Sequence, residues 1–193
     1  MFSTYFELGF DHILDIKAYD HILFIVALCA IYTISQWRDI LILVTAFTIG
    51  HCMTLVLSGL KLVNVNADLV EFLIPLTILM TAIINILQKQ PTPSDIEKSN
   101  LKLKWNYVMA LLFGLIHGLG FSNYFKALIG QEENIVSVLL PFNLGVEAGQ
   151  IIIVAIIMLV AWVVLDIFKA KQREWTLFIS GAAAGIAVIL MIG

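Results

Sequence analysis

Apolar residues of this chain form six long runs separated by short polar stretches. A helix needs about 20 mostly apolar residues to cross a bilayer, and each run reaches or approaches that length. The runs extend from Asp20 to Gln36, Asp39 to Leu60, Leu69 to Gln88, Trp105 to Phe125, Val136 to Phe168, and Trp175 to Gly193. The pattern predicts an all-α, polytopic membrane bundle of about six transmembrane helices, with residues 1–193 forming a single transmembrane domain.

Three local features refine this prediction. Pro141 is expected to kink the fifth run, or to mark the end of a separate segment leading into it. Residues 1–19 are expected to form an amphipathic segment at the outer surface, with His12 as a surface residue, and they lack the basic start of a cleaved signal peptide. Residues 89–104 contain Pro91 and Pro93 and are predicted to form an exposed cytoplasmic loop.

Composition agrees with a membrane protein and excludes other classes. Hydrophobic residues make up 61% of the chain and charged residues 13%, about half the charged share of a soluble domain. The lipid bilayer is therefore the expected surrounding. A net charge of −3 gives no basis for a nucleic-acid partner. Cys29 and Cys52 both fall in apolar runs, where two small buried thiols are expected rather than a disulfide.

The basic residues predict the orientation of the chain, because cytoplasmic loops carry an excess of Lys and Arg. If the N-terminus lies outside, eight of the 11 Lys and Arg residues fall in cytoplasmic segments. Both termini are therefore predicted to lie outside the cytoplasm.

Three ionisable residues, His51, His117 and Glu147, lie deep inside predicted spans. Such groups are costly in a bilayer and by default indicate a functional site. At about 1.5 Å per residue, His51 and His117 both lie roughly 18 Å from the cytoplasmic ends of their helices, and Glu147 lies roughly 16 Å below the outer end of its own. All three are expected in one layer near the midplane, with Asp20 and His21 at or above it.

Imidazole and carboxylate groups together suit divalent ions such as Zn²⁺, Ni²⁺, Co²⁺ and Cu²⁺. A set of His21, His51 and His117 with Asp20 or Glu147 would supply four ligands. Asp20 also has a simpler role available, as the N-cap of its helix. The residues expected to hydrogen-bond the ligands, and so to fix their orientation, are Asn143, Gln150 and Thr48.

Small residues at four-residue spacing predict close contacts between helices. The glycine pairs are Gly114 and Gly118, Gly145 and Gly149, and Gly181 and Gly185. These pairs predict a bundle and carry no functional information. They are also compatible with a homo-oligomer.

Four stretches resemble the HupE/UreJ family of small bacterial membrane proteins. They are GFDHILDIKAYDHILF at Gly9 to Phe24, AFTIGHCMTL at Ala46 to Leu55, FGLIHGLGF at Phe113 to Phe121, and FNLGVEAGQ at Phe142 to Gln150. The resemblance implies six helices in the bacterial inner membrane and nickel or cobalt uptake beside hydrogenase or urease maturation. It implies candidate ligands at His12, Asp20, His21, His51, His117 and Glu147. The metal stays open among Zn, Ni and Co.

Three functions fit these observations. The first is a permease for a divalent cation with a site near the midplane. The second is an intramembrane zinc hydrolase acting on a lipid or peptide, with Glu147 or Asp20 as the general base. The third is a structural or accessory membrane subunit. Bound metal, and its exchange, would distinguish them.

Overall fold

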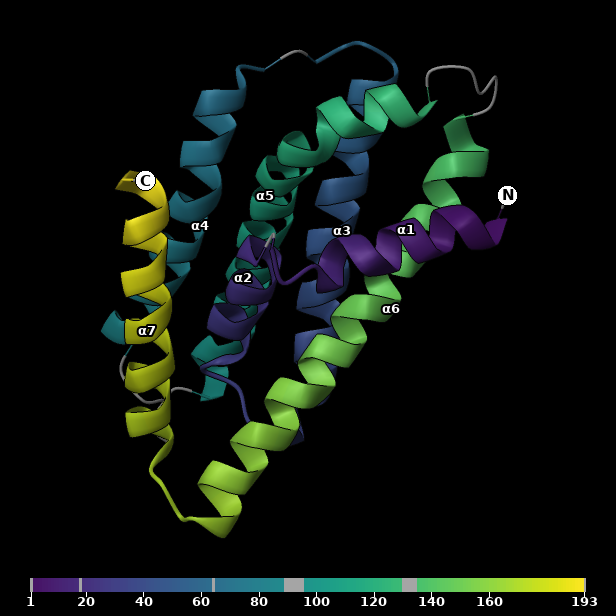
Figure 1. Ribbon diagram of the computed structural model, residues 1–193. Helices are drawn as coiled ribbons and strands as arrows, with labels where there is room; N and C mark the ends of the chain where they lie inside the picture. The colour runs from purple at the N-terminus through teal and green to yellow at the C-terminus, as the bar shows by residue number, and fades with distance from the viewer. Residues whose placement is uncertain (1, 18, 64, 89–95, 130–134, 193) are drawn as a thin grey trace.

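The described part of the chain is helical throughout its regular structure (Figure 1). The computed structural model describes residues 2–17, 19–63, 65–88, 96–129 and 135–192. The elements are α1 (Phe2–Leu14), α2 (Asp20–Cys29), the 3₁₀ turn η1 (Ile34–Gln36), α3 (Trp37–Gly59), α4 (Ala67–Leu87), α5 (Ile96–Ile129), α6 (Ile135–Trp162), the π-helical turn η3 (Val163–Ile167) and α7 (Gln172–Ile192). The prediction of an all-α bundle is confirmed.

Five helical segments in the described ranges are long and apolar enough to cross a membrane, rather than six. They are Ile34–Gly59, Ala67–Leu87, Trp105–Leu128, Ile135–Ile167 and Gln172–Ile192. The difference lies in the first apolar run, where α2 has 10 residues and is roughly 15 Å long. The run divides because the backbone N–H of Thr33 donates to the Gln36 side chain at 3.1 Å, in a capping box that begins a new helix.

Two other boundaries differ from the sequence prediction. Residues 96–104, expected in the loop, are the first part of α5, and residues 89–95 lie outside the described ranges. The helix α6 continues through Pro141, so no separate lead-in segment ends there. Proline is tolerated inside membrane helices because neighbouring groups satisfy the backbone carbonyl that it leaves unpaired.

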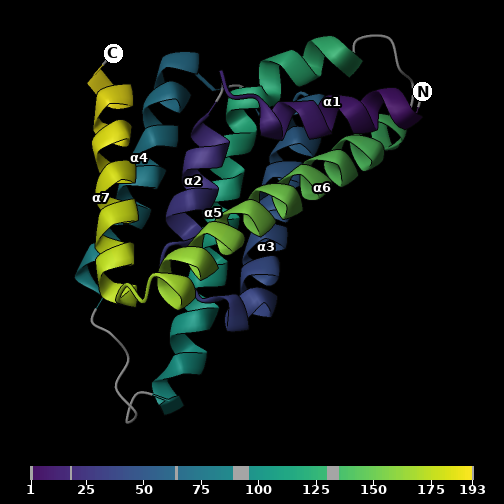
Figure 2. The same ribbon diagram turned by 60° about the horizontal axis from the view of Figure 1, so that its bottom comes forward.

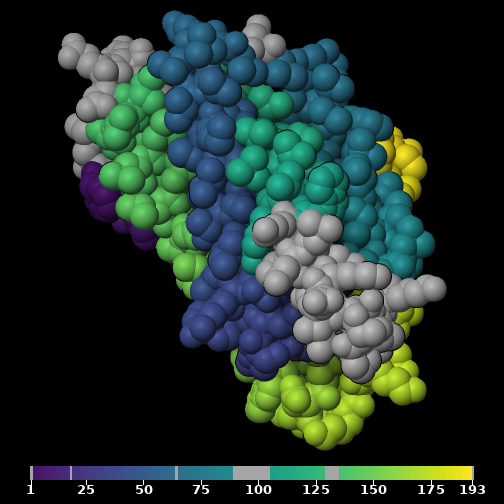
Figure 3. All heavy atoms as spheres, turned by 180° about the vertical axis from the view of Figure 1, so that it is seen from behind, coloured from purple at the N-terminus to yellow at the C-terminus, as the bar shows by residue number. Residues whose placement is uncertain are grey.

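The helices α3 and α5 lie side by side (Figure 3), and glycines bring their backbones into direct contact. A Cβ on Gly50 would overlap the carbonyl oxygen of Leu111, and a Cβ on Gly114 would overlap that of Phe47. A Cβ on Gly118 would lie 2.7 Å from the carbonyl oxygen of His51. Gly114 and Gly118, a predicted pair, therefore both face α3. The contact between α3 and α5 is the most extensive between helices in the described part of the bundle.

The N-terminal helix α1 crosses α6 in the same manner (Figure 1). A Cβ on Gly9 would overlap the carbonyl oxygen of Phe142, and one on Gly145 would overlap that of Phe6. Gly149 faces the side chain of Ile13. The predicted pair Gly145 and Gly149 thus forms the surface of α6 on which α1 packs. This contact fixes the amphipathic segment against the bundle.

The third glycine pair does not mediate a contact within the chain. The helix α7 packs beside α4 at one edge of the bundle (Figure 2). Gly181 and Gly185 lie on its exposed side, and a Cβ at either would meet no atom within 4 Å. Spacing alone could not distinguish this pair from the two that pack, because the sequence does not say which way each face points.

Candidate metal centre

All four histidines of the chain lie together in the bundle, although they come from four different helices. The ring centroid of His21 on α2 lies 4.8 Å from that of His12, 6.0 Å from that of His51 and 5.2 Å from that of His117. The rings of His12 and His51 are 5.9 Å apart. Ligand atoms within 4.8 Å of one another define two groups: His12, His21 and His51, and Asp20, His21 and His117. We call these four histidines and Asp20 the histidine cluster.

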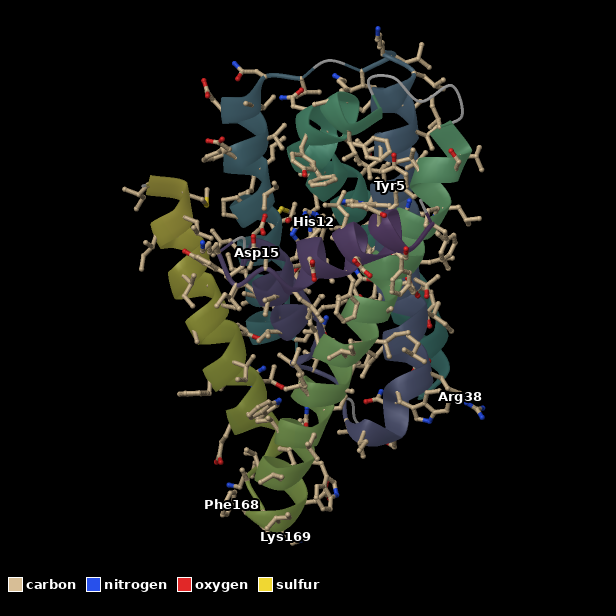
Figure 4. The ribbon with its side chains drawn as sticks, turned by 45° about the vertical axis from the view of Figure 1, so that its right-hand side comes forward. Tyr5, His12, Asp15, Arg38, Phe168 and Lys169 are labelled. Atoms are coloured by element: carbon tan, nitrogen blue, oxygen red, sulfur yellow. The ribbon has the colours of Figure 1, made fainter. Side chains whose placement is uncertain are left out.

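The glycine contacts described above set the positions of the rings. Gly50 and Gly118 are chain neighbours of His51 and His117, so the close approach of α3 and α5 brings these two side chains into one layer. The packing of α1 on α6 brings His12 beside His51. Figure 4 shows His12 on α1. His12 is therefore not the surface residue that its amphipathic segment suggested, because the α1 face that bears it packs inward.

Asp20 fixes the orientation of the His21 ring. The Oδ1 of Asp20 lies 3.1 Å from Nδ1 of His21 and also accepts the backbone N–H of His21 at 2.9 Å. A carboxylate accepts, so Nδ1 is the donor, and in the neutral ring the lone pair is then on Nε2. The expected N-cap role of Asp20 is wrong: Tyr19 occupies that position, and Asp20 is the first residue of α2.

Thr77 on α4 fixes His117 in a similar way. The hydroxyl of Thr77 donates to the carbonyl of Ile74 at 2.7 Å and lies 2.9 Å from Nε2 of His117. A hydroxyl has one proton, so it accepts from Nε2–H, and the lone pair of His117 is then on Nδ1. Thr77 was not among the site residues predicted from the sequence. The available signal was the i, i+4 pair of Thr77 and Thr81 in the apolar middle of α4.

Five buried ring nitrogens of the cluster have no hydrogen-bond partner among the residues that the structure describes. They are Nε2 of His12, Nε2 of His21, both nitrogens of His51 and Nδ1 of His117. Each unsatisfied buried polar group costs about 1–3 kcal/mol, so five in one place are a large departure from normal packing. In His21 and His117 the free nitrogen is the one that keeps its lone pair after the Asp20 and Thr77 hydrogen bonds are assigned. The donor set therefore fits a divalent transition metal.

Aromatic side chains pack around the histidine rings. Phe121 lies 4.1 Å from the ring of His12, and Phe24 and Phe47 lie 5.2 and 5.1 Å from that of His117. Burial, and then the proximity of His21, lower the pKa of His12 from 6.5 to about 3. His12 is therefore neutral at physiological pH, which is the form that binds a metal.

The hydrogen bonds given for Glu147, and for the predicted orienting residues Asn143, Gln150 and Thr48, go to residues outside the histidine cluster. Glu147 accepts a hydrogen bond from Thr45 and belongs to neither ligand group. Thr48 donates to the Gln150 side chain at 2.6 Å, and the Asn143 side chain donates to the carbonyl of Leu139 at 2.7 Å. These contacts join α3 to α6 or stay within α6. Helix spacing predicts the height of these residues along their helices but not the direction in which their side chains point.

Two surface depressions reach the cluster from its sides. One, of about 490 Å³, is lined by His12 together with Asp11 and Asp15 of the same segment. The other, of about 300 Å³, is lined by Asp20 and by Glu71 at the start of α4. Carboxylates therefore line both approaches, and carboxylate oxygens attract divalent cations.

A multi-pass helical membrane protein with a buried histidine cluster is the class that this fold and geometry define. Its sequence matches the family model described as HupE / UreJ protein over residues 1–192. The chain belongs to the HupE/UreJ family, which agrees with a membrane protein related to nickel or cobalt transport. No curated protein matches the chain, and no solved structure matches it.

Proposed function

We propose that this protein binds a divalent transition metal of the Ni²⁺, Co²⁺ or Zn²⁺ type at the histidine cluster and moves it across the membrane. The observation that carries the proposal is the set of five partnerless ring nitrogens buried at one point. Imidazole nitrogens are preferred ligands of these ions. His12, His21, His51 and His117 are the proposed ligands, and Asp20 and Thr77 hold two of the rings.

The two overlapping ligand groups favour transport over static binding. His21 belongs to both groups, so an ion held with His12 and His51 has a second set, with Asp20 and His117, within reach. An ion can be passed between such sets without losing all its protein ligands at once. We place the protein in the bacterial inner membrane with both termini outside, as the distribution of basic residues favours. In that orientation the depressions beside His12 and Asp20 are the entry side.

The direct test is metal content followed by uptake. The protein is purified in detergent and its bound Ni²⁺, Co²⁺ and Zn²⁺ are measured, and it is then reconstituted into vesicles that contain a metal-sensitive dye. We expect stoichiometric, exchangeable metal and protein-dependent uptake. A protein that binds none of the three ions would contradict the proposal.

A zinc hydrolase is the second candidate, because His12, His21 and His51 form a group of three ligands that excludes Asp20, and a catalytic zinc has three protein ligands and one open position. Asp20 would be its general base, since Glu147 belongs to neither group. The same metal assay separates the two functions. Tight zinc that does not exchange, without uptake into vesicles, would favour the hydrolase.

Thr77 offers a prediction that concerns the proposed site alone. Thr77→Val keeps the shape of the side chain but removes the hydroxyl that holds Nε2 of His117. Loss of a partner that orients a ligand typically lowers metal affinity by 10–100-fold. We expect that reduction in a Co²⁺ titration. Thr54→Val is the matched control, because the Thr54 hydroxyl donates to Gly50 and Leu115 carbonyls and contacts no histidine ring. Equal affinities in both variants would contradict the role of Thr77.

A further inference from the structure

A row of buried polar side chains leads along α4 away from the histidine cluster. Thr77, Thr81 and Asn85 are spaced four residues apart on one face of this helix and are 2%, 7% and 3% exposed. Thr77 contacts His117, and the hydroxyl of Thr81 donates to the Thr77 carbonyl at 2.9 Å. In an apolar bundle, polar groups at these positions must turn inward. We call them the α4 polar row.

The row ends at a cavity of about 50 Å³ between α2, α4 and α5. This volume exceeds the roughly 10–15 Å³ that one water needs. The polar residues lining it are Tyr32, Thr81, Asn85, Gln88 and Asn106. The lining extends from buried Ala110 to Trp105, which is 63% exposed, so the cavity approaches the surface at the end of α4.

From Thr77 to Gln88 the α4 axis rises roughly 16 Å. The cluster and the cavity are thus the two ends of one polar line, and the depression lined by His12 opens at the cluster end. We infer that the α4 polar row and this cavity are the exit route by which the divalent cation leaves the histidine cluster toward the membrane face at the end of α4. This inference rests on the proposed function and adds the direction and the residues of the path.

Asn85 closes the route in this structure. Its side-chain amide donates to the carbonyl of Ala27 on α2 at 2.7 Å and to the hydroxyl of Ser180 on α7 at 3.3 Å. It therefore ties three helices together across the row. Arg173 of α7 donates to the carbonyls of Asn85, Ile86 and Gln88, where a cation is stabilised by the C-terminal end of a helix. A shift of α7 would loosen both sets of bonds together.

Flux through vesicles tests the route. Thr81→Val removes one hydroxyl from the path, and the bond that it breaks lies within α4 itself, so the bundle keeps its contacts. We expect Co²⁺ uptake to slow about tenfold, the effect of one lost polar contact, with Co²⁺ affinity within twofold of wild type. Thr54→Val, equally buried but off the row, should keep the wild-type rate. Equal rates in the two variants would overturn the inference.

Thiol labelling tests the same route without metal. In a Cys29→Ala, Cys52→Ala background, Thr81→Cys should react with a small water-soluble methanethiosulfonate added on the Gln88 side of sealed vesicles, and Thr54→Cys should not. An unreactive Thr81→Cys would overturn the route. The two tests fail separately. A wild-type protein that binds no Co²⁺ would refute the proposed function. Labelling needs no cation, so it would still decide whether a water path exists.

Discussion

His51→Ala is expected to abolish stoichiometric metal binding. His51 is 1% exposed and both its ring nitrogens lack partners, so its removal takes away a proposed ligand and leaves the others in place. Removing an outer partner of a ligand costs 10–100-fold in affinity, and loss of the ligand itself should cost more than about 100-fold. The measurement is a Co²⁺ titration followed by the visible d–d absorption of the bound ion. His117→Ala should give the same result.

The stability of the metal-free protein distinguishes a metal ligand from a purely structural histidine, because replacing a structural histidine would destabilise the fold. His51→Leu replaces two unsatisfied polar atoms with an apolar side chain, so the metal-free variant should be more stable by about 1–3 kcal/mol while it loses metal. Cys52→Ala, at the next position on α3, should keep wild-type affinity. If His51→Leu destabilised the metal-free protein, or if His51→Ala bound Co²⁺ normally, His51 would be a packing residue and not a ligand.

Gly114→Ala is expected to destabilise the bundle strongly. The added Cβ would overlap the backbone carbonyl of Phe47, and a backbone atom cannot move aside as a flexible side chain can. Forced overpacking costs about 1–3 kcal/mol and occasionally more, and we expect the upper end of that range. Separation of α3 from α5 would also displace His51 from His117, so Co²⁺ affinity should fall. Thermal unfolding in detergent measures the first effect.

Gly181→Ala and Gly185→Ala are matched controls for Gly114→Ala. They make the same chemical change in a membrane helix, but a Cβ at either position meets no atom within 4 Å. Alanine forms helix better than glycine by about 1 kcal/mol, so both variants should equal or slightly exceed the wild-type midpoint. A normal midpoint for Gly114→Ala, or an equal loss of stability in all three variants, would show that the α3–α5 contact does not hold the bundle together.

The helical class, and the position of His51 and His117 inside apolar helices, could be predicted from the sequence. Apolar runs of sufficient length specify membrane helices, and a histidine within such a run lies within the helix that the run forms. The same reasoning overestimated the first span, because the capping box at Thr33 divides an apolar run that hydropathy treats as continuous. Local hydrogen bonds of this kind decide helix ends and are weak signals in an apolar background.

The apolar runs alone thus establish a helical membrane bundle, with ionisable residues placed inside its helices as candidate site residues. Which of these residues meet depends on the tertiary structure. In the folded bundle the ring of His12 lies beside that of His51, Thr45 donates a hydrogen bond to Glu147, and the Thr77 hydroxyl contacts His117. The physical reason is that spacing along a helix fixes height and face, whereas the partner of that face depends on how helices rotate and approach. Here that approach is set by glycine contacts between backbones, as the packed Gly114 and the unpacked Gly181 illustrate.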